Sequence, residues 1–402
     1  MENKLTNSHF ARPEHYRSYP IILKSASGST ITDVTGKEYL DLFSIMGSVN
    51  CGHNVPSLNA RLIEQVNALW NSNFFATEVQ LEAVAKIDSI LPEDINLAAL
   101  YSTGAEAIEL ALRIARQVTG RNRILSLREH FHGKTQGAMH LLQFFPDCYG
   151  PIPDAYRTVI NSDGSDDPAI LEQYLDAIPV HDVAAIIFEP VMGYSGPRRL
   201  HGDFMKTVRE FCDRHDIVMI ADEVLTGFHR CKGWFYSCQD EITPDIIVFG
   251  KGLGNGYPIS AVACKRGISG HVNDALPGST FAGNGLACAA ACGVIDYMQQ
   301  QQLHEQSAAL EKVFCEFFCQ PRFDAYDLRL DGTGGLLSIR FADPSFSQMQ
   351  EIYLDILSNG VITSHTRNYL RIMPPLTIAP SEFVRGLEVI GNALGAFLAK
   401  SS

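Results

Sequence analysis

The middle of the chain alternates short apolar runs with stretches of helical periodicity. Six runs rich in Val, Ile, Leu and Ala show no polar alternation, which is typical of strands buried on both faces of a parallel sheet. These runs are Leu97–Tyr101, Arg123–Leu127, Val183–Phe188, Ile217–Ala221, Asp245–Phe249 and Ser260–Cys264. Helical patterns over Ala105–Gln117 and Leu200–His215 lie between some of them. This alternation predicts an α/β fold with a doubly wound, mostly parallel sheet.

The two ends of the chain have a different pattern. Residues 27–41 alternate polar and apolar positions around a Thr-Gly turn, which predicts an antiparallel hairpin. The C-terminal third predicts a helix over about 302–319, a strand over 335–341, another helix and a final helix after Pro380. We therefore expect residues 1–50 and 298–402 to form one small α+β domain, and residues 51–297 to form the large domain.

Composition and charge narrow the class of protein. With 402 residues, 46% hydrophobic and 19% charged, the chain has an ordinary globular composition, which excludes disorder, collagen and a disulfide miniprotein. The 32 Lys and Arg residues against 45 Asp and Glu give a net charge of −13, which argues against nucleic acid or an anionic membrane as the main partner. The ten cysteines form no CxxC pair, so we expect reduced and mostly buried thiols.

The sequence favours a cytoplasmic protein. Its first residues lack the apolar core of a signal peptide. One uncharged stretch, 275–295, is long enough to cross a bilayer, but Pro277, Asn284 and four glycines argue against a membrane segment.

Four of the predicted strands end in polar or glycine-containing sequence. Ser102-Thr103-Gly104 follows the first run, and Glu189, Asp222 with Glu223, and Gly250-Lys251 follow three later runs. Ligands in open parallel sheets bind beyond the carboxyl ends of the strands, so these positions should meet in one crevice. A single charge at a strand end is common in loops, whereas four such ends predict a functional site. Carboxylates beside a lysine would also shift one another's pKa.

Three other kinds of site, for nucleotides, dinucleotides and metals, are not supported, because the residues do not have the spacing that each one needs. Gly-Lys-Thr at 133–135 is no P-loop, because Arg128 stands where that motif needs glycine. The glycines of 250–256 lack the dinucleotide-binding spacing, and His130 and His132 lack an evident third metal ligand, so we expect no metal. Residues 102–105 suit phosphate binding at a helix N-terminus, although an ordinary helix cap explains this segment better when it is taken alone.

A lysine imine with pyridoxal phosphate is the remaining chemistry. Burial would lower the pKa of Lys251 and make its amine nucleophilic toward an aldehyde, and the surrounding glycines leave room for a flat cofactor. A buried carboxylate at Asp222 could keep a pyridine nitrogen protonated. Phe131 could stack on one face of the ring while Val224 packs on the other.

The chain resembles the class III aminotransferases, which are fold-type I pyridoxal-phosphate enzymes, over nearly its whole length. The motifs that carry this resemblance are DVTGKEYLD (33–41), CGH (51–53), STGAEA (102–107), FHGKT (131–135), EPVMGYSG (189–196), ADEVLTGFHR (221–230), PDIIVFGKGLGNGYP (244–258), STFAGN (279–284) and LRIMPPLTI (370–378). Each motif is weak alone, but the complete series in this order is specific.

The resemblance implies roles for individual residues. Lys251 would form the internal aldimine and shuttle the substrate proton, and Asp222 would pair with the pyridinium nitrogen. Thr280 would reach the phosphate of the neighbouring subunit, which implies a homodimer. Arg371 would take a substrate carboxylate. The other cofactor contacts would come from Ser102, Thr103, Gly104, Ala105, Phe131, His132, Glu189 and Val224.

Three residues depart from the family pattern. Ala105 replaces a common Ser or Thr, Leu225 replaces a Gln of some relatives near the ring hydroxyl, and Tyr194 stands where members that handle glutamate or ornithine often have a Glu that pairs with the arginine. Met46 and either Phe74 or Phe75 would join Tyr194 in making the substrate pocket apolar. We therefore expect a donor or acceptor with a hydrophobic or uncharged body.

The function that this resemblance implies is ping-pong transamination from an amine or amino-acid donor to an aldehyde or ketone acceptor. An aminomutase of the glutamate-1-semialdehyde type, or a racemase, is the alternative that uses the same cofactor. A phosphate-dependent nucleotide binder would be stabilised by nucleotide, but Arg128 argues against it. A non-catalytic fold would not require both Lys251 and Asp222.

Overall fold

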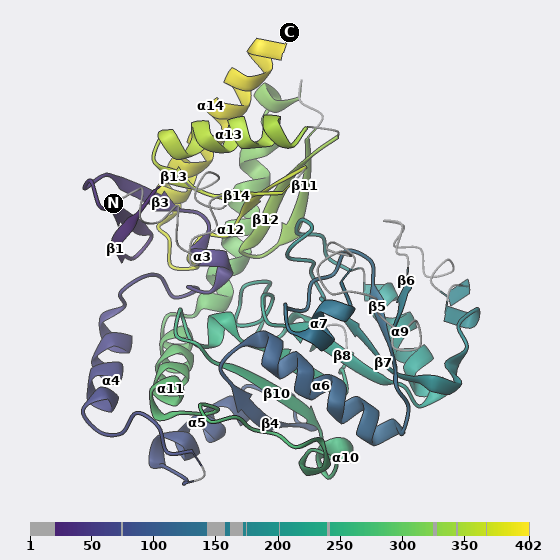
Figure 1. Ribbon diagram of the computed structural model, residues 1–402. Coiled ribbons are helices and arrows are strands. Elements are labelled where there is room, and N and C mark those ends of the chain that lie inside the picture. The colour runs from purple at the N-terminus through teal and green to yellow at the C-terminus, as the bar shows by residue number, and fades with distance from the viewer. Residues whose placement is uncertain are drawn as a thin grey trace, which may run out of the picture.

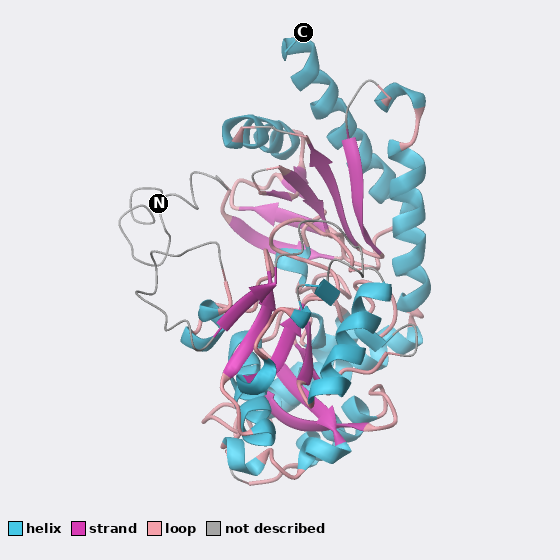
Figure 2. Cartoon of the chain, turned by 90° about the vertical axis from the view of Figure 1, so that its right-hand side faces the viewer, coloured by secondary structure: helices cyan, strands magenta, loops and turns pink. Residues whose placement is uncertain are grey.

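The computed structural model describes residues 21–73, 75–142, 157–160, 172–173, 175–200, 202–238, 242–324, 328–342, 345–366 and 368–401. A large sheet with its helices forms the lower part of the molecule, and the N-terminal strands lie beside the C-terminal segments in the upper part (Figure 1). Figure 2 shows the last helix, α14 (Pro380–Ser401), ending at the top, far from the large sheet.

The large sheet has seven strands. In their order across the sheet they are β4 (Ile95–Tyr101), β10 (Ser260–Lys265), β9 (Ile246–Phe249), β8 (Val218–Glu223), β7 (Val183–Phe188), β5 (Arg123–Leu127) and β6 (Arg157–Ile160). β6, β5, β7, β8 and β9 run parallel, and β10 runs antiparallel to both of its neighbours. Two successive reversals leave β4 and β9 pointing the same way. The predicted α/β fold with a mostly parallel sheet is confirmed.

Two features of the sheet differ from the sequence expectation. β10 is antiparallel because only residues 250–259 separate it from β9, and a parallel connection needs a crossover of about a dozen residues or more. β6, at the edge, was not among the predicted runs, because its four residues include an arginine and a threonine. The other predicted strands match the observed ones to within a few residues.

Helices cover both faces of the large sheet. Ile187 of β7 packs in the apolar cluster that contains Ile108 of α6 (Gly104–Thr119). Its neighbour Ile186 packs in the cluster that contains Phe204 and Val208 of α9 (Gly202–His215). Successive strand residues point to opposite faces, so α6 and α9 lie on opposite sides of the sheet. This arrangement explains why the strands lack polar alternation.

The chain ends share a small sheet. β1 (Leu23–Ser27), β2 (Thr30–Asp33) and β3 (Glu38–Asp41) are antiparallel, as predicted for the hairpin, and β13 (Val361–Ile362) pairs in parallel with β3. A second sheet has the order β11 (Leu328–Thr333), β12 (Leu336–Phe341), β15 (Tyr369–Ile372) and β14 (Ser364–His365). Helices α12 (Leu303–Phe318), α13 (Phe346–Ser358) and α14 belong to this region. The domain boundaries given above stay a prediction.

Six further α-helices lie in the described chain. They are α3 (Ser44–Gly47), α4 (Pro56–Val66), α5 (Glu78–Asp88), α7 (Gln136–His140), α10 (Arg266–Ser269) and α11 (Gly285–Gln300). The uncharged stretch 275–295 enters α11, whose alanine-rich length is mostly buried against α4 and α5. In the described ranges, none of the helices has the length and apolarity needed to cross a membrane.

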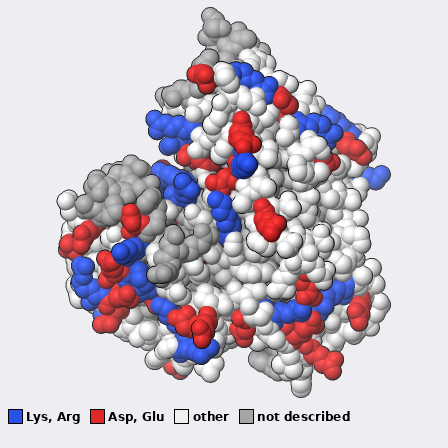
Figure 3. Space-filling view, turned by 180° about the vertical axis from the view of Figure 1, so that it is seen from behind, with Lys and Arg blue, Asp and Glu red and all other residues white. Residues whose placement is uncertain are grey.

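The charged surface is mixed. On the face shown in Figure 3, acidic and basic side chains lie interspersed rather than in one field. The nine cysteines that the structure describes are free thiols, and most of them are buried. Among the described residues there is also no group of three His, Cys, Asp or Glu side chains that could hold a metal ion.

Candidate active site

The four polar strand ends meet in one cavity of about 380 Å³. Ser102 to Gly104 follow β4, Glu189 follows β7, Asp222 is the last but one residue of β8 and Lys251 follows β9 by two residues, and all of them line this cavity. The shared direction of β4, β7, β8 and β9 brings their carboxyl ends to one edge of the sheet. Residues of β15 and of the N-terminal segment close the opposite side of the cavity.

Lys251 opens the loop after β9 in a strained backbone conformation. Its φ of 40° lies in the left-handed region, which is uncommon for a residue with a side chain. Burial lowers the pKa of the Lys251 amine, while the charges of Asp222 and Glu189 act to raise it and Arg371 acts to lower it. The net direction is downward, so the neutral, nucleophilic form of the amine is favoured relative to an exposed lysine.

Asp222 is held in a buried position at the end of β8. Its Oδ2 lies 2.8 Å from Nδ1 of His132, and its Oδ1 accepts the N–H of Val224 at 3.1 Å. His132 is buried too, and its Nε2 has no hydrogen-bond partner among the described residues. These contacts fix the direction of the carboxylate, which faces the cavity.

Glu189 connects three parts of the cavity wall. Its carboxylate accepts the backbone N–H of Phe131 at 2.7 Å and that of Gly193 at 3.1 Å. Burial, with the nearby charge of Asp222, raises the pKa of Glu189 to about 8. The backbone N–H of Glu189 donates to Nδ1 of His130 at 2.8 Å, so His130 carries its proton on Nε2. Burial lowers the pKa of His130 well below its usual range.

The segment that follows β4 is a helix cap that also faces the cavity. The Thr103 hydroxyl accepts the N–H of Glu106 at 3.3 Å and donates to its carboxylate at 3.0 Å, so the ordinary helix cap is present. Ser102 to Ala105 nevertheless line the cavity at the N-terminus of α6, where free N–H groups and the helix dipole favour anions.

Glycine at position 104 lets the start of α6 approach the side chain of Val224 closely. A Cβ there would lie 2.8 Å from one methyl of Val224 and 3.0 Å from the other. The start of α6 therefore packs directly against Val224, on the side of the cavity that the sequence assigned to this residue. A larger residue at position 104 would have to displace Val224 or the helix start.

Aromatic rings form another wall. Phe131 and Tyr194 lie stacked, with ring centroids 5.2 Å apart and an interplanar angle of 21°. Both rings line the cavity. Glu189 holds the backbone on both sides of this pair, because its two acceptors bind residue 131 and the residue before Tyr194.

Arg371 reaches the cavity from β15. Its Nη1 donates to the carbonyl of Gly193 at 3.1 Å, and its Nε donates to the Ser364 hydroxyl at 3.0 Å. The Arg371 side chain is buried and lines the cavity together with the buried Met373 and the partly exposed Met46. The substrate side of the cavity therefore combines one buried guanidinium with thioether and aromatic surfaces.

Two predicted residues lie elsewhere in this chain. Phe75 is 80% exposed and is not part of the cavity lining, and Phe74 lies outside the described residues. Thr280 is exposed, and its carbonyl accepts a hydrogen bond from Asn71 at 3.1 Å rather than reaching the cavity of the same chain.

Sequence reasoning also missed some lining residues. Lys134 and Tyr257 lie within the FHGKT and GKGLGNGYP motifs, so their positions gave a signal, but the direction of each side chain did not follow from the motif. Met373 follows Arg371 by two residues on the same strand end.

The residues of the cavity fit pyridoxal phosphate. A flat ring can lie between Phe131 and Val224, and a buried carboxylate lies where a ring nitrogen needs a partner. The helix N-terminus provides an anion site for the phosphate, and the Lys251 amine can meet the aldehyde. Each of these groups comes from a different element, and a glycine permits the tight packing between two of them.

Comparisons with known proteins found similar sequences over nearly the whole chain. Residues 11–394 match the family model of the class-III aminotransferases. Acetylornithine aminotransferase of Archaeoglobus fulgidus is 31% identical over 383 residues, covering 94% of this chain and 96% of that protein. 5-aminovalerate aminotransferase DavT of Pseudomonas aeruginosa is 31% identical over 401 residues, covering 93% of each chain.

Solved structures show the same fold. An amine transaminase from an uncultivated Pseudomonas species, in its pyridoxal-phosphate-bound form, matches with a TM-score of 0.88 and 26% identity, covering 99% of this chain and 98% of the other. Ornithine aminotransferase from Toxoplasma gondii matches with a TM-score of 0.85 and 25% identity, covering 99% and 97% of the two chains.

Proposed function

This chain belongs to the class-III aminotransferase family and is a pyridoxal-phosphate-dependent aminotransferase, and on that premise we propose which of its residues carry the reaction. The similar proteins are transaminases, so the aminomutase alternative is not favoured. The observation that carries the proposal is the meeting of Lys251, Asp222 and Glu189 in one cavity.

Lys251 is the proposed amine and proton carrier. The bound cofactor supplies an aldehyde that reacts with amines and a protonated pyridine ring that accepts the electron pair of a broken C–H bond. The lowered pKa of Lys251 lets its Nζ act as a nucleophile, and then as the base that takes a proton from the substrate and returns it. The left-handed turn at φ 40° sets the direction in which the Lys251 side chain leaves the backbone.

Asp222 is the proposed partner of the ring nitrogen. Its position at a buried strand end keeps water away, which strengthens the interaction between its carboxylate and a protonated nitrogen. The hydrogen bond with His132 leaves this carboxylate little freedom to turn away. Phe131 and Val224 would hold the ring from opposite faces, and Ser102 to Ala105 would hold the phosphate.

A homodimer with shared sites is the proposed assembly. Thr280 is exposed, and it lies beside Asn71 in a region that displays large apolar side chains. Trp70, Phe75 and Phe281 are 62%, 80% and 64% exposed. An apolar surface of this kind is typical of an interface, and a second copy would cover it. From there Thr280 would reach the phosphate in the partner's cavity.

The proposed donors carry a primary amine remote from any α-carboxylate. Ornithine and 5-aminovalerate, in the names of similar proteins, have such an amine. Arg371 supplies one carboxylate site, and Met46 and Tyr194 supply apolar surface for an uncharged body. A ping-pong sequence follows, in which the donor leaves its amino group on the cofactor and an aldehyde or ketone then collects it.

Replacing Lys251 by alanine tests the proposal directly. We expect turnover to fall by about 100-fold or more, the range for a lost general base, while thermal stability and circular dichroism stay near those of the wild type. Borohydride reduction of the loaded wild-type protein should attach the cofactor to the peptide that contains Lys251. Attachment at another lysine, or normal turnover in the variant, would remove Lys251 from its role.

Lys265→Ala is a matched control. Lys265 ends β10 at the opposite edge of the same sheet, where it pairs with Asp245 at 2.9 Å. This variant should keep its turnover.

Mixing the loaded wild-type protein with a panel of amines, and following the loss of its yellow colour, would then identify the donors.

A further inference from the structure

A single left-handed turn forms part of the cavity wall. In α3, the residues Ser44, Ile45, Met46 and Gly47 have φ values of 46°, 46°, 64° and 70°. Three of these four residues carry side chains that disfavour this conformation. Such strain persists only where the surrounding structure imposes it, and it clusters at functional sites. Met46, in the middle of the turn, lines the cavity.

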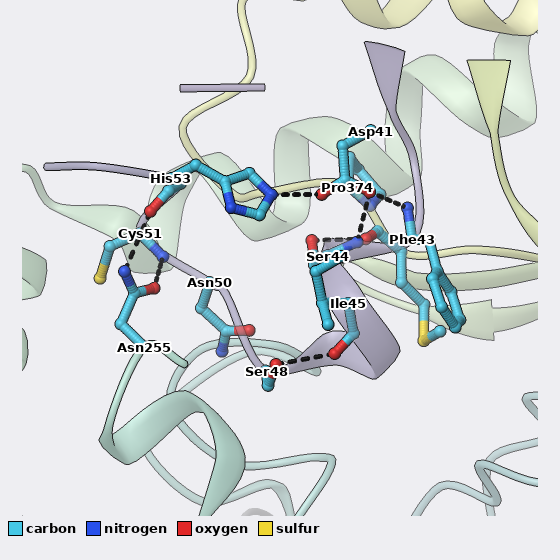
Figure 4. Close-up of polar contacts among 12 residues, drawn as sticks. Asp41, Phe43, Ser44, Ile45, Ser48, Asn50, Cys51, His53, Asn255 and Pro374 are labelled. Atoms are coloured by element: carbon cyan, nitrogen blue, oxygen red, sulfur yellow. Dashed lines mark hydrogen bonds and ion pairs between the residues drawn. The ribbon is translucent and has the colours of Figure 1, made fainter. Parts of the chain in front are cut away.

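Asp41 holds the start of this turn (Figure 4). Its Oδ1 accepts the backbone N–H groups of Phe43 and Ser44, each at 2.8 Å, and its Oδ2 lies 2.7 Å from Nε2 of His53. The Ser44 hydroxyl donates to the carbonyl of Met373 at 2.6 Å. Asp41 is fully buried and does not line the cavity, so it acts on the cavity only through the turn.

The chain after the turn is attached to the loop of the reactive lysine. Asn255 accepts the N–H of Cys51 at 2.8 Å and donates to the carbonyl of Gly52 at 2.9 Å (Figure 4). Asn50 donates to the carbonyl of Phe228 at 2.9 Å. Both ends of the turn are therefore fixed: Asp41 and the Ser44 hydroxyl hold its start, and the bonds of Asn50 and Asn255 hold the chain that follows it.

We propose that Asp41 is a positioning residue for substrate selection: it maintains the left-handed turn that places Met46 in the wall, and so sets the width of the substrate side of the cavity. This inference rests on the proposed function of the cavity. Loss of the Asp41 carboxylate would let the turn relax to ordinary backbone angles and move Met46 out of the wall. Bulkier amines would then be accepted.

Asp33 offers a matched control. It lies in the same hairpin, is buried, and its Oδ1 accepts the N–H groups of Thr35 and Lys37 at 2.8 and 3.0 Å. It does not line the cavity and does not contact the turn. Asp33→Ala therefore removes a similar set of bonds from the same sheet without affecting Met46.

The experiment uses the protein with pyridoxal phosphate bound and compares kcat/KM for a small aliphatic amine with kcat/KM for a bulky aryl-alkyl amine. Met46→Ala should raise the ratio in favour of the bulky amine by about tenfold, as expected for opening an apolar pocket. Asp41→Ala should shift the ratio in the same direction. The double variant should lie within about twofold of Met46→Ala, because both changes remove the same wall. Asp33→Ala should keep the wild-type ratio.

Hydrogen exchange in the cofactor-free protein gives a second measurement. Peptides covering residues 43–49 should exchange faster in Asp41→Ala than in the wild type, and at the wild-type rate in Asp33→Ala. If Asp41→Ala does not fold, His53→Ala removes only the Oδ2 contact and should shift both measurements less, in the same direction.

The proposal is overturned if the folded variant at Asp41, or at His53 in its place, keeps wild-type selectivity while Met46→Ala changes it. It is also overturned if the Asp33 variant changes selectivity equally. Failure of the proposed function looks different: the wild type would then transaminate none of the amines, whereas the exchange measurement would still report on the turn.

Discussion

At the scale of single residues, the site depends on ionisable groups that the cavity largely shields from water, which makes their charged forms less stable. Asp222 and Glu189 are buried in one cavity with Lys251, which is half-buried. Their environments differ, since Asp222 contacts an imidazole whereas Glu189 accepts two backbone N–H groups. Different environments allow similar carboxyl groups to take different tasks.

Asp222→Asn should lower kcat/KM by about 100-fold or more, on the scale of a lost electrostatic contact in a water-excluded site. The amide cannot balance the charge of a protonated ring nitrogen. Asp245→Asn is the control, because Asp245 precedes β9 at the opposite edge of the sheet and bonds Arg209 and Lys265. It should reduce thermal stability but not the rate. Steady-state kinetics that show a normal rate for Asp222→Asn would exclude this role.

Glu189 should make the stability of the cofactor-free protein depend on pH. Its pKa of about 8 in the folded protein lies above the value of 4.5 for a solvated glutamate, so the folded state binds this proton more tightly. The stability that the protonated group contributes is complete below about pH 4.5 and is lost as the pH rises through 8. Because Glu189→Gln stays neutral, its melting temperature should improve relative to the wild type between pH 5 and 8.5. A constant difference would contradict the raised pKa.

The reactive residues could be predicted from the sequence because each one stands just after a predicted strand. Lys251, Asp222 and Glu189 each follow a buried apolar run, and parallel strands bring such positions together. The wall around Met46 could not be found in this way. Nothing in the letters SIMG predicts a left-handed turn, because the preferences of Ser44, Ile45 and Met46 oppose it. Buried bonds to Asp41, three residues earlier, and to Met373, far along the chain, hold it.

At the scale of elements, the strands predicted from the sequence agree with the observed ones, because a strand buried on both faces has a continuous apolar sequence. The direction of β10 could not be predicted from its sequence, since an apolar run does not indicate whether the neighbouring strands are parallel to it. That reversal has a use in the site. β10 begins at the edge where β4 ends, and its first residue, Ser260, donates to the carbonyl of Thr103 at 2.7 Å.

The two ends of α6 should respond differently to the same substitution. Gly104→Ala places a methyl group against Val224, so cofactor affinity should fall by about tenfold, as overpacking of 1–3 kcal/mol implies. Gly120→Ala, at the C-terminal end with φ 66°, should cost about 1 kcal/mol of stability and leave cofactor affinity unchanged. Absorbance titration with the cofactor and thermal melts measure the two effects. Equal loss of affinity in both variants would mean that only helix stability matters.

At the scale of the whole molecule, one chain does not bring every residue of the proposed site into its own cavity. Thr280 is exposed and lies outside the cavity of its own chain, near Trp70 and Phe281, whose apolar side chains are exposed. The sequence could name Thr280 through the family resemblance, but its place in an assembly depends on a surface that a single-chain pattern does not encode. A second copy of the chain would account for both observations.

Mixed dimers test whether Thr280 acts across the interface. Lys251→Ala and Thr280→Ala proteins should each have low activity alone. After the two are unfolded and refolded together, a mixed dimer has one site with an intact lysine and an intact partner threonine, so about a quarter of all sites should recover. Recovery is measured as turnover per bound cofactor. Activity no greater than the average of the two separate variants would place Thr280 in its own chain's site or outside any site.

The pairing of β3 with β13 joins Leu40 to Val361, residues from opposite ends of the polypeptide. During synthesis, β3 leaves the ribosome long before its neighbour exists, so it must wait as an open sheet edge until the last tenth of the message has been translated. A nascent chain that stalls earlier exposes that edge and invites pairing with other chains. Premature termination before Val361 should therefore leave this edge of β3 unpaired and send this protein into aggregates, whereas termination just before Pro380 removes only the C-terminal helix and keeps the pairing.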